Sequence, residues 1–158
     1  MKRLAILLIA LCLLSGTAFS ASTMTESWHE QGHDRKYQIL KLALVAHTDG
    51  TFTTVAITAA GFMNNLTTDP QRKYYLTEVY ADPGATTPTN GSSIQIQHSS
   101  FGTPDVMEGG MAGLSNATSA RFTPPVRPVL VFEQLKIAWS GNSVNGGLYD
   151  LYLIFERW

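Results

Sequence analysis

The sequence contains little cysteine, little charge and no convincing helix after its first twenty residues, although Leu and Lys leave a helix over residues 37–47 as an alternative to a strand. Its single cysteine, Cys12, excludes an intramolecular disulfide framework and a zinc site made of several thiolates. Only 15% of the 158 residues are charged, against about 25% in ordinary globular domains, which excludes a highly charged disordered chain. The net charge is −1, so cations do not outnumber anions. We therefore expect no nucleic-acid partner.

The longest apolar run lies at the N-terminus. A basic pair, Lys2-Arg3, precedes the eleven apolar residues 4–14, and Ala18-Phe19-Ser20 then places small residues where a signal peptidase cuts. This run is too short for a hydrocarbon core of ~30 Å, which takes about 20 residues. We therefore expect residues 1–20 to be a signal peptide, the mature chain to be periplasmic or extracellular, and no stable membrane insertion after cleavage. A retained membrane anchor is the alternative.

Period-two alternation dominates the rest of the chain. Residues 21–36 are polar, and we expect them to form a loosely ordered lead-in to a single domain over residues 37–158. The β-rich runs that follow are residues 37–47, 52–59, 73–80, 94–97, 129–132, 135–139 and 148–155. Turn- and loop-forming residues separate these runs. The pattern predicts an all-β fold, an antiparallel β-sandwich (jelly-roll-like) of seven or eight strands.

Two turn segments favour hairpins. Thr48-Asp49-Gly50-Thr51 lies between the first two runs, and residues 140–147 (SGNSVNGG) precede the last run. The last run, residues 148–155, has apolar residues on both faces. We therefore expect it to be a central strand, or one covered on both sides.

One segment matches the zinc-protease pattern H-E-x-x-H. In that chemistry His29 and His33 would bind zinc from one face of a helix, and Glu30 would be the general base. Gly32 disfavours such a helix by ~1 kcal/mol relative to Ala, and the flanking residues carry no apolar stripe. We therefore expect no cofactor, no metal and no catalytic residue. A small zinc metallopeptidase remains a remote alternative, as does an adventitious surface metal site.

Aromatic residues are the other candidates for a binding site. Tyr74, Tyr75 and Tyr80 lie on one predicted strand and are candidates for stacking against a sugar ring. The further aromatic candidates for such a platform are Trp139, Tyr149, Tyr152 and Trp158. Aromatic residues of strands more often lie in the core or in cross-strand pairs. The tyrosines thus leave a secreted glycan-binding or adhesin-like module as an alternative to a purely structural role.

The order of the turn and strand motifs is distinctive. These motifs are DPGATTPTN at 82–90, DVM at 105–107, GG at 109–110, GLSNATS at 113–119, RPV at 127–129, LKI at 135–137, SGN at 140–142 and LYDLYL at 148–153. In this order and spacing, residues 37–155 resemble short, poorly characterised β-rich proteins encoded in tailed-phage genomes and phage-like metagenomic contigs. The HEQGH lead-in departs from that group.

The resemblance contains no catalytic signature and implies a non-enzymatic structural or interaction protein. Its implied partners are proteins, either other virion proteins or further copies of the same chain. Its implied location is the virion or the host envelope. Virions of tailed phages assemble in the cytoplasm, whereas the leader predicts export. Either the product acts at the host envelope, or the leader is not processed.

Overall fold

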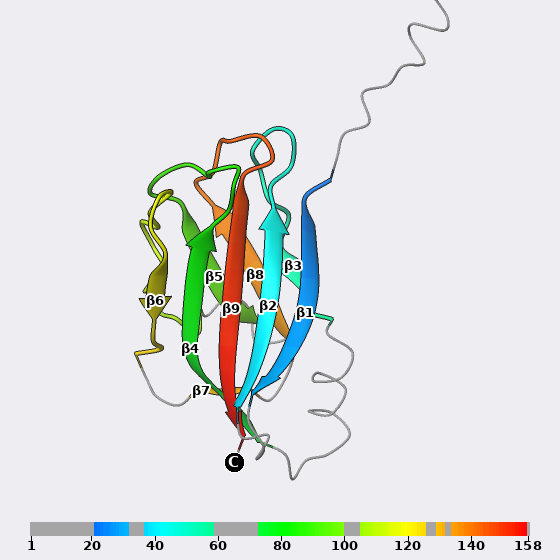
Figure 1. The fold of residues 1–158 in the computed structure, drawn as a ribbon, viewed down its shortest axis with the longest axis vertical. Helices are drawn as coiled ribbons and strands as arrows, with labels where there is room; N and C mark the ends of the chain where they lie inside the picture. Colours follow the sequence, from blue (N-terminus) through cyan, green and yellow to red (C-terminus); the bar gives the residue numbers. More distant parts are fainter. Residues whose placement is uncertain are drawn as a thin grey trace, which may run out of the picture.

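A computed structural model describes residues 21–31, 37–58, 73–99, 105–125, 129–131 and 134–157. It contains nine strands in two antiparallel sheets (Figure 1). The strands are β1 Thr23–Gln31, β2 Tyr37–Val45, β3 Val55–Ala56, β4 Tyr74–Pro83, β5 Ser93–His98, β6 Ala120–Phe122, β7 Val129–Val131, β8 Leu135–Ser140 and β9 Leu148–Arg157. The described residues include no helix, and therefore no apolar helix with the length that a bilayer requires. The prediction of an all-β sandwich is confirmed, while the expected signal peptide, residues 1–20, lies outside the described residues.

The strands pair in a nested order. The larger sheet runs β1-β2-β9-β4-β6, with β7 also paired to β4, and the smaller sheet runs β3-β8-β5. Strand β2 thus pairs with β9, β3 with β8, and β4 with β6 and β7. Two isolated bridges, Ser92 with Leu114 and Gln97 with Asp105, bring the segment after β5 back against β5. This nesting corresponds to a jelly roll, in which one long hairpin is wound around a core.

The inner faces of the two sheets form one hydrophobic core. On β2 the alternate residues Leu40, Leu42 and Leu44 are buried, as the period-two pattern requires. The sheets meet at an aromatic contact, where the Trp139 ring of β8 lies 5.3 Å from the Tyr149 ring of β9 in an edge-on arrangement. Burial raises the pKa of Tyr149, whose hydroxyl donates to the carbonyl oxygen of Ser115 at 2.8 Å. The core thus consists mainly of alternate residues from strands of both sheets, together with Met107, Met111 and Leu114 of the segment between β5 and β6.

The expectation of a loosely ordered lead-in over residues 21–36 is wrong for its first half. Residues 23–31 form β1, an edge strand paired with β2 over nine residues, while residues 32–36 lie outside the described part of the chain. Met24 packs against the core, and Glu26 accepts a hydrogen bond from the backbone N–H of Thr58 at 2.7 Å. Polar residues suit this position because one side of an edge strand faces solvent.

The two predicted hairpins are also wrong. Strands β2 and β3 flank the turn at residues 48–51 but belong to different sheets, and the same is true of β8 and β9 around residues 140–147. Both loops therefore carry the chain from one sheet to the other. Turn-forming residues predict a change of direction, but they do not specify the sheet that the next strand joins. The prediction that residues 148–155 form a central strand is confirmed, because β9 lies between β2 and β4.

Three loops are joined at one end of the sandwich. The Asn142 side chain accepts from the backbone N–H of Thr89 at 2.9 Å and donates to the carbonyl oxygen of Gly50 at 2.8 Å. Gly50 has φ +82°, and a Cβ there would lie 2.5 Å from a backbone carbon of Ser143. A side chain at residue 50 is therefore excluded both by conformation and by space.

The turn at residues 48–51 gives a pH-dependent prediction. Hydrogen bonds from the Thr51 hydroxyl and backbone N–H lower the pKa of Asp49 to about 2 from its usual 3.8. The stability that this carboxylate contributes is present above pH 3.8 and is lost as the pH falls toward 2. We expect Thr51→Val to raise the pKa of Asp49 in an NMR titration, because it removes the hydroxyl donor. An unchanged Asp49 midpoint in that variant would contradict this account of the turn.

Candidate functional site

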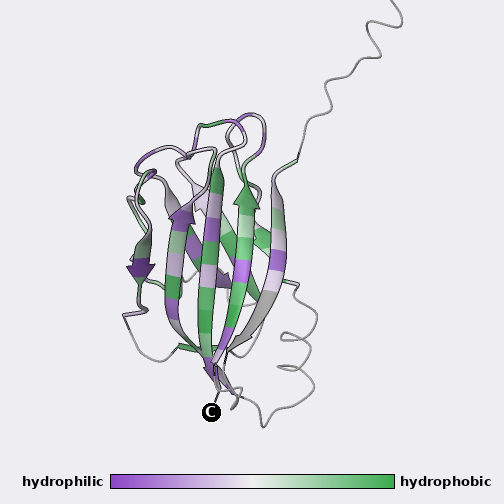
Figure 2. Cartoon of the chain, in the orientation of Figure 1, coloured by the Kyte–Doolittle hydropathy of each residue, from purple (hydrophilic) through white to green (hydrophobic). Residues whose placement is uncertain are grey.

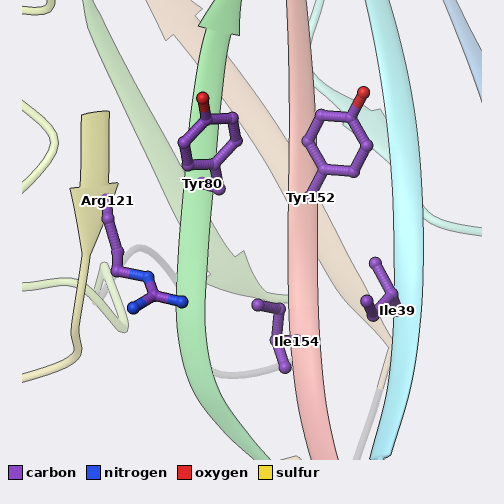
Figure 3. Close-up of a pocket in the computed structure, with 5 residues that line it drawn as sticks. All are labelled: Ile39, Tyr80, Arg121, Tyr152 and Ile154. Atoms are coloured by element: carbon purple, nitrogen blue, oxygen red, sulfur yellow. The ribbon is translucent and has the colours of Figure 1, made fainter. Parts of the chain in front are cut away.

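The outer face of the larger sheet carries a shallow pocket. It has a volume of about 260 Å³ and is lined by Ile39 of β2, Tyr80 of β4, Arg121 of β6, and Tyr152 and Ile154 of β9 (Figure 3). These residues alternate along their strands with core residues. The outward side chains are both apolar, such as Ile39 and Ile154, and polar, such as Arg121. Figure 2 shows the hydropathy of all residues along β2 and β9, with hydrophilic positions between hydrophobic ones. The pocket is therefore an amphipathic surface.

A straight row of five residues crosses the sheet through this pocket. The register pairs Ser27 with Lys41, Lys41 with Tyr152, Tyr152 with Tyr80, and Tyr80 with Arg121. The row thus reads hydroxyl, cation, aromatic ring, aromatic ring, cation. Neighbouring strands lie ~4.8 Å apart, so the row is ~19 Å long. We call these five residues the tyrosine row.

The two rings at the centre of the row are close together. The centroids of Tyr80 and Tyr152 lie 5.9 Å apart and their planes make an angle of 59°. This is a tilted cross-strand pair, within the usual range for aromatic contacts. Tyr80 keeps 36% of its surface exposed, so its ring is available to a ligand.

Each cation of the row lies against a carboxylate. Lys41 Nζ is 2.6 Å from Asp150 Oδ2 and 5.4 Å from the centre of the Tyr152 ring. The hydrogen bond to Asp150 raises the pKa of Lys41, so this side chain is charged at neutral pH. At the other end, Arg121 Nη2 is 3.1 Å from Glu78 Oε2. The row therefore offers charged donors and acceptors side by side, without an excess of positive charge.

The structure separates the three tyrosines that the sequence singled out. Tyr74 is 1% exposed and belongs to the core, so it is unavailable for stacking against a ligand, and that expectation is corrected. Tyr75 is half-buried and lies on the outer face, opposite Glu156 of β9. Tyr80 lies in the pocket. The bulge between residues 76 and 78 shifts the register of β4, so counting by two from Tyr74 gives the wrong face for Tyr80.

Sequence reasoning gave no site role to Ile39, Ile154 or Arg121. Tyr152 was one of several further aromatic candidates for stacking against a sugar, and Arg121 carried no signal, because β6 has only three residues. The period-two alternation of residues 37–47 puts Ile39 and Lys41 on the same face of a strand. Only the strand order β2-β9-β4-β6 brings these residues next to Tyr80.

The H-E-x-x-H segment begins in a strand. His29 and Glu30 lie in β1 and pair with Ile39 and Gln38 of β2, whereas the zinc-protease chemistry needs the segment on a helix. His33 lies outside the described residues. Across the part of the chain that the structure describes, no three His, Cys, Asp or Glu side chains are grouped so that they could hold a metal ion.

We expect the mature chain to purify with less than one zinc per chain. Glu30→Gln, or His29→Ala with His33→Ala, should change the free energy of unfolding by no more than about 0.5 kcal/mol, because the segment is polar and carries no apolar stripe. Metal analysis after tag-free purification and thermal melts with and without a chelator measure this. One tightly bound zinc, with a large fall in melting temperature on chelation, would restore the metal-site hypothesis, because the binding free energy of a structural zinc is folding free energy.

Comparison with known proteins finds no relative: no protein-family model, no curated protein and no solved structure matches the chain. Function is therefore inferred from the outer face of the larger sheet and from the sequence.

Proposed function

We propose that this protein is a non-enzymatic interaction protein of a tailed phage, which binds its partner through the outer face of the larger sheet. The single observation that carries the proposal is the pocket around Tyr80 and Tyr152, where two aromatic rings are flanked by ion-paired side chains. Concave, partly apolar surfaces with a few convergent polar groups are the usual form of a binding site.

The outer face is favoured over the loops for a physical reason. Its side chains project from paired strands β2, β9, β4 and β6, so their backbone positions are held by the sheet. A site on strands is more rigid than one on loops and loses less entropy when it binds. The loop cluster around Asn142 is engaged in its own hydrogen bonds, which suits a structural role.

The association with phage and the export of the chain depend on the sequence. The resemblance over residues 37–155 supports a phage-encoded protein, and the apolar run with its small-residue cleavage site supports export. Together they favour a product that acts at the host envelope.

Two measurements test location. We expect N-terminal sequencing of the exported protein to begin at Ala21. Quantitative mass spectrometry of purified phage particles and of host envelope fractions should find the chain in one or both. A product that retains Met1 and stays in the soluble cytoplasm, absent from particles and envelopes, would contradict the proposal.

A binding experiment tests the site. The labelled mature protein is incubated with host envelopes and the retained fraction is measured. We expect the double variant Tyr80→Ala with Tyr152→Ala to lose most of its retention, because both rings of the pocket are removed. Lys136→Ala, on the outer face of the smaller sheet, is the control and should behave as the unchanged protein. Circular dichroism and melting curves verify that each variant is folded. Retention that is equal in all three proteins would show that the outer face is not the binding surface.

A further inference from the structure

We infer that the outer face of the larger sheet binds a neutral saccharide chain, laid across the strands along the tyrosine row. This inference rests on the proposed function, since it names the chemical class of the ligand at the same site. It is carried by the rings at the centre of the row and by the pairing of every cation in it.

The rings supply the apolar part of the recognition. A pyranose ring has one face made of C–H bonds, and this face packs against an aromatic ring that is open to solvent. Tyr80 and Tyr152 form such a surface, with Ile39 and Ile154 beside them in the same pocket. Stacking on rings that are already fixed in a sheet costs little side-chain entropy.

The ion pairs supply the polar part. A sugar ring carries hydroxyl groups around its edge, and each hydroxyl both donates and accepts hydrogen bonds. Two ion pairs place a charged donor beside a charged acceptor, one on each side of the rings. They are Lys41 with Asp150 and Arg121 with Glu78. Hydrogen bonds to charged groups are stronger than those between neutral groups. Hydroxyls at the edge of a stacked ring are complementary to this arrangement.

The same charges disfavour other ligands. A polyanion needs cations that are free to neutralise it, whereas Lys41 lies 2.6 Å from Asp150 and Arg121 lies 3.1 Å from Glu78. A further carboxylate of this face, Asp82, is cross-strand from Asp150 and accepts a hydrogen bond from the Ser119 hydroxyl. An aliphatic chain would remove water from these charged groups and offer no hydrogen bonds in its place. A neutral, hydroxyl-rich chain is therefore the ligand that fits the face.

The dimensions favour an oligosaccharide over a single sugar. The pocket of about 260 Å³ lies at or below the lower end of ligand-pocket volumes, which suits one ring of a longer ligand. The row extends beyond the pocket on one side, through Lys41 of β2 to Ser27 of β1, and measures ~19 Å from Ser27 to Arg121. We therefore expect affinity to rise with chain length until the row is covered.

Calorimetric titration of the mature chain with defined oligosaccharides tests this inference. The neutral probes are cellohexaose, maltohexaose and chitohexaose, and the anionic probes are a heparin hexasaccharide and hexagalacturonic acid. We expect at least one neutral probe to bind, more tightly than its disaccharide, with an affinity that depends little on salt. Salt independence follows because binding a neutral chain displaces no counterions.

Variants link the binding to the row. We expect Tyr152→Ala to weaken the affinity for the neutral probe by about tenfold or more, as truncation at the centre of a binding site does. Tyr152→Phe keeps the ring and should retain most of the affinity. Lys136→Ala, on the outer face of the smaller sheet, should leave the affinity unchanged.

Other results would overturn the saccharide inference alone or together with the proposed function. Binding to the anionic probes alone, with steep salt dependence, overturns the inference. So does self-association that Tyr80→Ala abolishes, because the face would then be an interface between copies of the chain. If none of the neutral probes binds while envelope retention still requires Tyr80 and Tyr152, the saccharide inference fails and the proposed function stands. If retention is also independent of these residues, both fail.

Discussion

Strand β9 is paired along its length on both sides, with β2 and with β4, and the two faces of the molecule depend on this pairing. Its inward residues Leu151 and Leu153 are fully buried in the core, and the outward Tyr152 lies between them in sequence. The register that buries the leucines therefore also fixes the tyrosine on the outer face, because a shift of one residue would exchange the two faces. The pairing register of β9 therefore determines both the core and the candidate site.

The nested order of pairing explains how distant segments of the chain meet in the tyrosine row. Lys41 comes from the first half of the domain, Tyr80 and Arg121 from its middle, and Tyr152 from its end. Antiparallel pairing puts them in line across the sheet. The ion pairs on either side then keep the cations beside the rings, and the raised pKa of Lys41 reflects its hydrogen bond to Asp150. The result is a rigid amphipathic surface with balanced charge.

Local patterns predicted the strands well and their partners poorly. Alternation identified the buried and the outward faces of β2, and the apolar character of residues 148–155 identified a central strand, because both depend on burial. The prediction of two hairpins was wrong because turn-forming residues do not specify the sheet that the next strand joins. Strand β1 was missed because the polar residues of an edge strand resemble a linker. Of the suggested tyrosines, Tyr74 is buried and Tyr80 lies in the pocket. Period-two counting could not predict this difference, because the bulge in β4 lies between the two residues.

In the proposed complex, the rings of Tyr80 and Tyr152 form the contact surface for the apolar face of a sugar. Intermolecular nuclear Overhauser effects test it most directly, measured on the mature protein saturated with whichever neutral oligosaccharide it binds. We expect cross-peaks between the C–H protons of a pyranose ring and the ring protons of both tyrosines. Cross-peaks confined to residues of the loops or of the smaller sheet would contradict it.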